Sequence, residues 1–190
     1  MSSCNIKKLS ILLAFCFLVF ILISCTSTER NNSAQNTHDS KNMPDDFDIY
    51  YSEWINVDNK NIFDTYNGYI QKDLITAGTS KIKYSATKEV LDSIYQEIIK
   101  LNMCSIDKEM TSSKLTKTNS IVGMSPCTYY EISFTIDGKK YTILGDETSD
   151  LYINENEQAN SFCSFIQFMK NLIHSTEEYK SLPEAEGGYA

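Results

Sequence analysis

The stretch that decides the fold runs from Thr128 to Ile143 and reads TYYEISFTIDGKKYTI. Apolar and polar residues alternate in it on both sides of Asp137-Gly138. Because Asp-Gly readily adopts the positive φ angles of a two-residue turn, the pattern predicts two antiparallel strands joined by a tight hairpin. Each strand would bury only one face, so the fold needs a second layer that covers one side of the sheet.

Three more extended segments precede this hairpin. Residues 47–52 alternate between apolar and polar types, and a longer extended segment follows over 62–74. Asn67-Gly68 breaks this segment, and a glycine within a strand indicates a bulge or a close backbone approach. Ile82 and Tyr84 mark a further short strand.

Two segments carry apolar residues at helical spacing, over 90–101 and 157–174. Ser85 or Thr87 is placed to cap the first helix. The polar stretch 110–125, between the first helix and the hairpin, is predicted to be a long loop. The order β-β-(β)-α-β-β-α therefore predicts an α+β fold, with an antiparallel sheet of four to five strands and two helices packed on one face.

The first residues have the order of a secretory signal. Lys7 and Lys8 precede an apolar run over 11–23, and Ser24 then stands directly before Cys25. The run is well short of the roughly 20 apolar residues that cross a bilayer, so an uncleaved span is the less favoured alternative. The sequence Leu-Ile-Ser-Cys resembles the lipobox of bacterial lipoproteins, which implies cleavage before the cysteine and a diacylglycerol on its sulfur. Two acyl chains hold a protein stably at a membrane.

The expected organisation is a signal peptide over 1–24, a flexible tether over 25–45 and a single α+β domain over 46–190. The tether is rich in Ser, Thr and Asn and has few bulky apolar residues, a composition that does not order itself. The mature chain would have 166 residues (190 − 24) and a net charge near −10 (15 − 25), since the signal holds two of the 17 basic residues and none of the 25 acidic ones. It contains no basic cluster, so nucleic acid is not an expected partner.

Cys104, Cys127 and Cys163 are the cysteines that follow Cys25. Three thiols can form at most one internal disulfide, and the sequence does not select among the pairings. Alternatively, all three are buried as small hydrophobic residues. Their spacings fit neither a zinc ribbon nor a redox C-x-x-C motif, and we expect no metal and no cofactor.

The residues that could carry out catalysis are few. His38 lies in the tether, and His174 at the end of the last predicted helix is better explained by the helix dipole than by catalysis. Asp146, Glu147 and Asp150 follow the hairpin and could perform acid-base hydrolysis of an envelope sugar, although loop carboxylates are more often simply solvated. The chain has no Gly-x-Ser-x-Gly or His-Glu-x-x-His motif.

Tyrosines are the stronger candidates for binding. Tyr50, Tyr69 and Tyr129 fall out of phase with the apolar residues of their strands, so we expect them on the open face of the sheet, where aromatic rings can stack against a ligand. The leading hypothesis is therefore a non-enzymatic domain that binds a protein, a peptide or an envelope component. The alternatives are an envelope hydrolase, and an inhibitory or protective lipoprotein that occludes another protein through its sheet or through residues 110–125.

The sequences NIFDTY over 61–66 and QKDL over 71–74, followed by a capped helix, resemble uncharacterised lipoproteins of low-GC Gram-positive bacteria. The resemblance covers the first half of the predicted domain. It implies a membrane-anchored location and a small α+β domain. It implies no site residue, because the family has no assigned activity.

Lipidation of Cys25 can be tested on the full chain expressed in a Gram-positive host. We expect mass spectrometry to find diacylglycerol on Cys25 and cell fractionation to recover the protein with the membrane. Cys25→Ala should abolish both results, whereas Cys16→Ala, in the departing signal, should change neither. An unmodified Cys25 thiol in a cytosolic protein would contradict the prediction.

Overall fold

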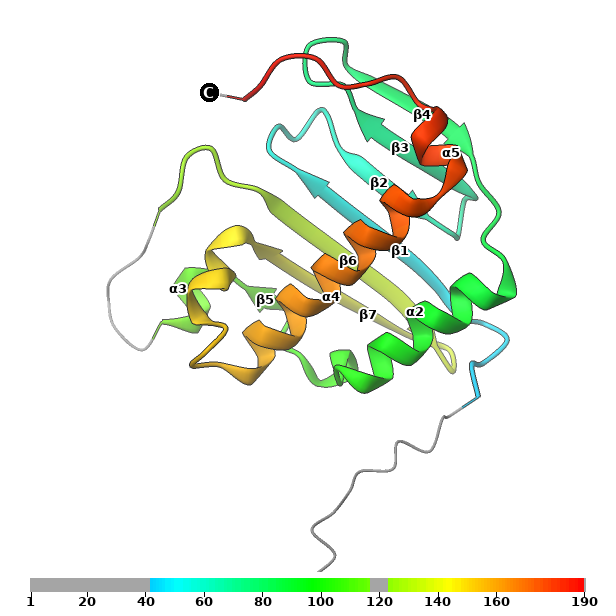
Figure 1. Cartoon of the computed structure of the whole chain (residues 1–190). Coiled ribbons are helices and arrows are strands. Elements are labelled where there is room, and N and C mark those ends of the chain that lie inside the picture. The colour runs from blue at the N-terminus through cyan, green and yellow to red at the C-terminus, as the bar shows by residue number, and fades with distance from the viewer. Residues whose placement is uncertain (1–41, 117–122, 190) are drawn as a thin grey trace, which may run out of the picture. The chain divides into compact units, whose positions relative to one another are not determined.

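The computed structural model describes residues 42–116 and 123–189. It is an α+β fold in which seven strands form one sheet, in the order β4-β3-β2-β1-β6-β7-β5, and the helices α2 and α4 lie across one face of it (Figure 1). The strands are β1 (Asp48–Trp54), β2 (Asn61–Asp64), β3 (Tyr69–Asp73), β4 (Thr79–Lys83), β5 (Glu109–Met110), β6 (Tyr129–Ile136) and β7 (Lys139–Asp146). The helices are α2 (Lys88–Lys100), α3 (Ser112–Leu115), α4 (Glu157–Ser175) and α5 (Glu177–Ser181), with 3-10 turns η1 (Met103–Ser105) and η2 (Glu147–Tyr152). The predicted signal, Cys25 and most of the predicted tether lie outside the described residues.

The predicted hairpin is confirmed as β6 and β7. Asp137 and Gly138 have φ angles of 51° and 73°, the positive values that its two-residue turn requires. The carboxylate of Asp46 accepts hydrogen bonds from both turn amides, at 3.1 Å and 2.5 Å. Asp46 therefore fixes the hairpin against the start of β1.

The prediction of one extended segment over 62–74 was wrong. The structure divides it into β2 and β3, an antiparallel pair connected by a turn that ends at Gly68. Gly68 has a φ of 69°, and a Cβ there would lie 3.3 Å from the Tyr84 carbonyl oxygen. The Asp64 carboxylate stabilises the turn by accepting from the Asn67 backbone amide at 3.0 Å and from its side-chain amide at 2.7 Å.

The prediction of an antiparallel sheet with four to five strands was also wrong. The sheet has seven strands and is mixed, because β5 pairs in parallel with β7 through Glu109 with Leu144 and Met110 with Gly145. The stretch 110–125 was expected to be a loop. β5 ends at its first residue and α3 lies within it. Residues 117–122 of this stretch lie outside the described part of the chain. A strand of two residues is too short to show a sequence period.

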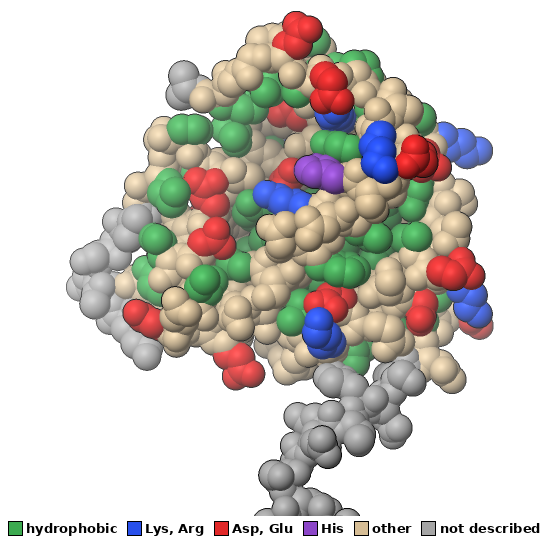
Figure 2. All heavy atoms as spheres, in the orientation of Figure 1, with side chains coloured by type: hydrophobic (Ala, Val, Ile, Leu, Met, Phe, Trp, Pro, Cys, Tyr) green, Lys and Arg blue, Asp and Glu red, His purple; other side chains and the backbone are tan. Residues whose placement is uncertain are grey.

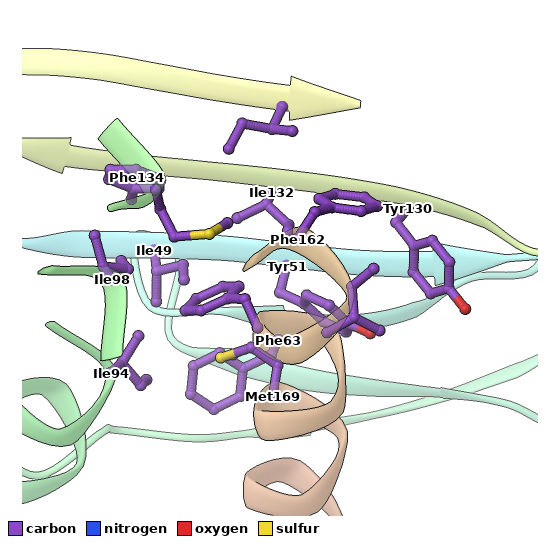
Figure 3. Packing of buried hydrophobic residues seen from close by; sticks show 14 of the residues in the cluster. Ile49, Tyr51, Phe63, Ile94, Ile98, Tyr130, Ile132, Phe134, Phe162 and Met169 are labelled. Carbon is purple, nitrogen blue, oxygen red and sulfur yellow. The ribbon is translucent and has the colours of Figure 1, made fainter. Parts of the chain in front are cut away.

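The two long helices are confirmed, with Thr87 as the N-cap of α2 and Asn156 as that of α4. Figure 3 shows how α4 directs Phe162 and Met169 toward the buried side chains of β1, β2 and β6. Burying a large apolar side chain contributes roughly 1.5–3 kcal/mol, so this packing is the main favourable term in the domain. Among the described residues, no helix has the length and apolar character to cross a membrane.

The Phe162 side chain of α4 packs directly against Gly145 in β7. A Cβ at this position would lie 2.4 Å from Phe162 Cζ and 2.7 Å from the Met110 carbonyl oxygen. The backbone of Met110 belongs to β5 and cannot move without disturbing the parallel pair. Glycine is therefore required here by space.

Gly145→Ala should destabilise the domain by about 1–3 kcal/mol, the usual cost of overpacking a core. Urea denaturation of the variant and the parent protein measures this difference. Gly123→Ala is the matched control, because a Cβ at Gly123 has no atom within 4 Å. Equal stability of the two variants would show that the neighbouring side chains accommodate a Cβ at position 145, and would contradict the prediction.

Candidate functional site

Tyr50 and Tyr69 lie on the open face of the sheet, on either side of Asp64. The register pairs Tyr50 with Asp64 and Asp64 with Tyr69, so the three form one row across β1, β2 and β3. A depression of about 490 Å³ lies over this row and is also lined by Tyr66 and Glu131. The two predicted residues therefore share one surface feature with two carboxylates. We call it the tyrosine depression.

Tyr129, the third predicted tyrosine, is part of a different cluster. Its ring stacks on Trp54, with centroids 6.0 Å apart, and the Lys60 ammonium lies 3.9 Å from the centroid of the Trp54 ring. Tyr129 does not line the tyrosine depression. The predicted residues thus form two groups on the sheet.

Two of the tyrosine rings that line the tyrosine depression already have ammonium groups over them. Lys81 Nζ lies 3.2 Å from the ring centroid of Tyr69, and Lys140 Nζ lies 6.0 Å from that of Tyr66. Such contacts are favourable because the ring face is electron-rich. Burial raises the pKa of Tyr50, and the charges of Glu131 and Asp64 raise it further. The depression therefore combines ring faces with negative charge.

The predicted hydrolytic carboxylates have structural contacts instead. Asp146 caps η2, where its carboxylate accepts from the Thr148 amide at 3.0 Å and from the Thr148 hydroxyl. Glu147 accepts from the Thr128 amide at 3.0 Å. Asp150 is exposed. None of the three carboxylates lines the tyrosine depression or the cavity described below.

In the described residues no disulfide joins Cys104, Cys127 and Cys163, and each is half-buried. Cys163 lies on α4, with its sulfur 3.3 Å from the Ser149 hydroxyl. Burial raises the pKa of Cys163 to about 12. Its thiol is therefore protonated at neutral pH and is a weak nucleophile. The described residues also hold no group of three or more His, Cys, Asp or Glu placed to bind a metal.

A row of polar side chains closes the apolar core on its helix-covered face. Glu53 in β1 pairs with Tyr130 in β6 and with Asn61 in β2. Because Ile62 faces Gln71, the next residue pair places Lys72 of β3 beside Asn61. We call Tyr130, Glu53, Asn61 and Lys72 the polar row.

Glu53 is the centre of this row. Its carboxylate accepts from Lys170 Nζ at 3.0 Å, from the Tyr51 hydroxyl at 3.1 Å and from the Asn61 amide at 3.2 Å. Lys170 comes from α4 and also donates to the Tyr130 hydroxyl at 3.3 Å. Burial lowers the pKa of Lys170, but the charge of Glu53 and the Tyr130 contact outweigh it, so the net shift is upward.

A cavity of about 330 Å³ opens beside the polar row. Lys72, Lys170 and His174 line it, and His174 stacks on Tyr179 of α5 with centroids 4.8 Å apart. Figure 2 looks onto this side of the molecule, where blue, red and purple side chains border a hollow near the C-terminal helix. Tyr189, near the end of the chain, donates to Asp73 at 2.6 Å across the rim.

Sequence reasoning did not identify the polar row. Glu53, Asn61 and Lys72 occupy the inward positions of their strands, where alternation predicts apolar residues. The sequence contained one signal for this row: each of three neighbouring strands has a polar residue at a position that faces the core. The three positions can be recognised as neighbours only when the pairing of β1, β2 and β3 is known. That pairing was not predicted, because β2 and β3 were expected to form one segment.

The tyrosines of the buried network make stability depend on alkaline pH. Burial raises the pKa of Tyr51 well above its ordinary value of 10.0, and the charge of Glu53 adds to the shift. Below about pH 10 Tyr51 is protonated in both states and stability is unaffected. Above it, the unfolded chain loses this proton while the folded chain retains it, so the free energy of unfolding falls as pH rises.

We expect Tyr51→Phe to reduce this alkaline loss by up to about 1.4 kcal/mol per pH unit. Urea denaturation at pH 8 and pH 10.5 measures the change, with Tyr129→Phe, an exposed position, as the control. An identical pH dependence in the parent protein and Tyr51→Phe would refute the assignment.

Comparison with known proteins does not assign this chain to a family. No protein-family model matches it. No curated protein matches it either. The nature of a ligand or partner therefore has to be inferred from the chemistry of the two sites.

Proposed function

We propose that this protein is a lipid-anchored protein on the extracytoplasmic face of a bacterial cell membrane, and that it binds a cationic segment of another protein or peptide in the tyrosine depression. The signal pattern that ends at Cys25 and the resemblance to uncharacterised Gram-positive lipoproteins support the location. The single observation that carries the binding proposal is the arrangement of Tyr50, Tyr66 and Tyr69 around Glu131 on an open sheet face.

The chemistry favours a cationic partner for two reasons. The rings of Tyr66 and Tyr69 already lie beneath the ammonium groups of Lys140 and Lys81, so the geometry for a lysine is present. Glu131 lies in the depression beside Tyr50, and its charge raises the pKa of that tyrosine. A lysine or arginine of a partner can therefore stack on a ring and pair with a carboxylate at once.

The proposal is for binding without catalysis. The three carboxylates considered for hydrolysis lie outside both sites, and Asp146 and Glu147 have local hydrogen-bond partners. The remaining alternative is occlusion of another protein through the sheet or through residues 110–125. The second of these routes has less support, because Met110 and Leu115 are buried in the core. Surface tyrosines contribute large contact areas at a low cost in conformational entropy, as is usual at binding interfaces.

Binding can be tested with the full chain in detergent micelles and a pentalysine peptide as the probe. We expect saturable binding by isothermal titration calorimetry, and none with the fully acetylated peptide. Glu131→Gln should weaken binding at least about threefold, because it removes a charge partner. Lys140→Gln should strengthen it, because it removes a competing ammonium group.

Glu155→Gln is the matched control, since it changes the net charge equally at an exposed residue on the turn before α4. If Glu155→Gln weakens binding as much as Glu131→Gln does, attraction by net charge explains the result and the proposed site is wrong. Equal binding of the acetylated peptide would also contradict the proposal.

A further inference from the structure

Lys72 is a buried cation with an exposed partner. Its side chain is 8% exposed, whereas that of Glu184, whose carboxylate lies 3.2 Å from Lys72 Nζ, is 87% exposed. Withdrawing an ammonium group from water is unfavourable unless an anion compensates it. An ion pair that depends on so exposed a carboxylate contributes little, because solvent screens it and the side chain loses freedom in making it. The anion beside Lys72 is thus easily exchanged.

The other carboxylates near the cavity are committed elsewhere. Glu53 accepts from Lys170 and from two neutral groups of the sheet. Asp73 accepts from the Tyr189 hydroxyl at 2.6 Å and from the Ile75 amide at 2.7 Å. Neither can turn toward Lys72 without losing these bonds. Glu184 is the carboxylate whose release costs least.

Glu184 belongs to the segment that forms one wall of the cavity. This segment follows α5 and is held to the turn after β3, where the Thr76 hydroxyl donates to the Glu186 carbonyl at 3.0 Å. Leu182 is buried and anchors the beginning of the segment, and Tyr189 anchors its end at Asp73. The backbone of the wall can therefore stay in place while the Glu184 side chain turns out to solvent.

The other residues that line the cavity indicate which kind of ligand could replace the Glu184 carboxylate. Trp54, Tyr179 and Tyr189 present aromatic surface, and Ile55 and Ile75 add aliphatic surface. A volume of about 330 Å³ lies at the lower end of the range for small-molecule sites, so the cavity suits a compact molecule and not a polymer. A ligand that fits this cavity would therefore have one anionic group, placed at Lys72, and an apolar body that packs against the rings.

We infer that this cavity is a binding site for a small organic carboxylate, and that Glu184 occupies the position of the ligand's carboxylate in the unliganded protein. The incoming carboxylate accepts from Lys72 Nζ in place of Glu184, while the ligand's apolar body packs against Tyr179, Tyr189 and the aliphatic side chains of Ile55 and Ile75. The site lies on the helix-covered face of the sheet and is separate from the tyrosine depression. It does not depend on the function proposed above.

Trp54 is the single tryptophan of the chain and lines the cavity, so its fluorescence reports on binding directly. The experiment is a titration of the full chain in detergent micelles with benzoate, and with benzamide as the uncharged probe of the same shape. We expect a saturable change in Trp54 emission with benzoate only. Glu184→Gln should tighten benzoate binding about two- to fivefold, the size expected when an exposed competing ion pair is removed.

Lys72→Met keeps most of the side-chain volume and should weaken benzoate binding at least about tenfold, since it removes a charged hydrogen-bond donor. Lys81→Met on the neighbouring strand is its control and should leave binding unchanged. The inference is overturned if benzamide binds as well as benzoate, or if Glu184→Gln binds benzoate no more tightly than the parent protein. Competition by sulfate equal to that by benzoate would show a simple anion site and would refute the organic ligand. Because Glu184 is exposed, its variant tests the inference even if Lys72→Met does not fold.

Discussion

The packing of α4 across the middle of the sheet is the interaction on which the other features of this domain depend. Phe162 and Met169 fill the space above β1 and β6, and Gly145 leaves room for the Phe162 ring against β7. The same helix then brings Lys170 and His174 to the end of the core, one turn apart. The apolar stripe of α4, which continues to Ile173, thus holds the helix against the sheet, and the polar side of its last turns supplies Lys170 and His174 at a fixed position.

The charged group that α4 places at the end of the apolar core has an energetic consequence. A buried ion pair is costly unless further hydrogen bonds satisfy both charges. Glu53 meets that condition through Lys170, Tyr51 and Asn61. Lys72, two strands away in the same row, pairs with the exposed side chain of Glu184, and its ammonium group lies 5.1 Å from the ring centroid of Tyr179. The domain therefore stabilises the Glu53–Lys170 pair with several hydrogen bonds, and leaves Lys72 with a carboxylate partner that solvent screens.

The sequence predicted the parts of this fold that local patterns determine. The Asp137-Gly138 hairpin and the two long helices were expected and are present, because turn chemistry and helical periodicity act over a few residues. The division of 62–74 into two strands was missed, because a four-residue turn within an alternating stretch keeps the alternation almost in phase. β5 was missed because two residues carry no period. The open-face position of Tyr50 and Tyr69 followed from their phase, whereas the polar row required the pairing of three strands, which no local pattern encodes.

The two edges of the sheet bear on how copies of this protein behave when crowded together. An outermost strand with unpaired backbone groups can recruit another chain and begin aggregation. At one margin β4 is short and displays Lys81 and Lys83, whose like charges repel a second copy. At the other margin β5 covers only Leu144 and Gly145 of β7. The part of β7 that β5 does not pair begins with Lys139 and Lys140, whose like charges also repel a second copy. Neither margin is a good template for strand addition, and a dense population of these molecules on one surface is expected to remain dispersed.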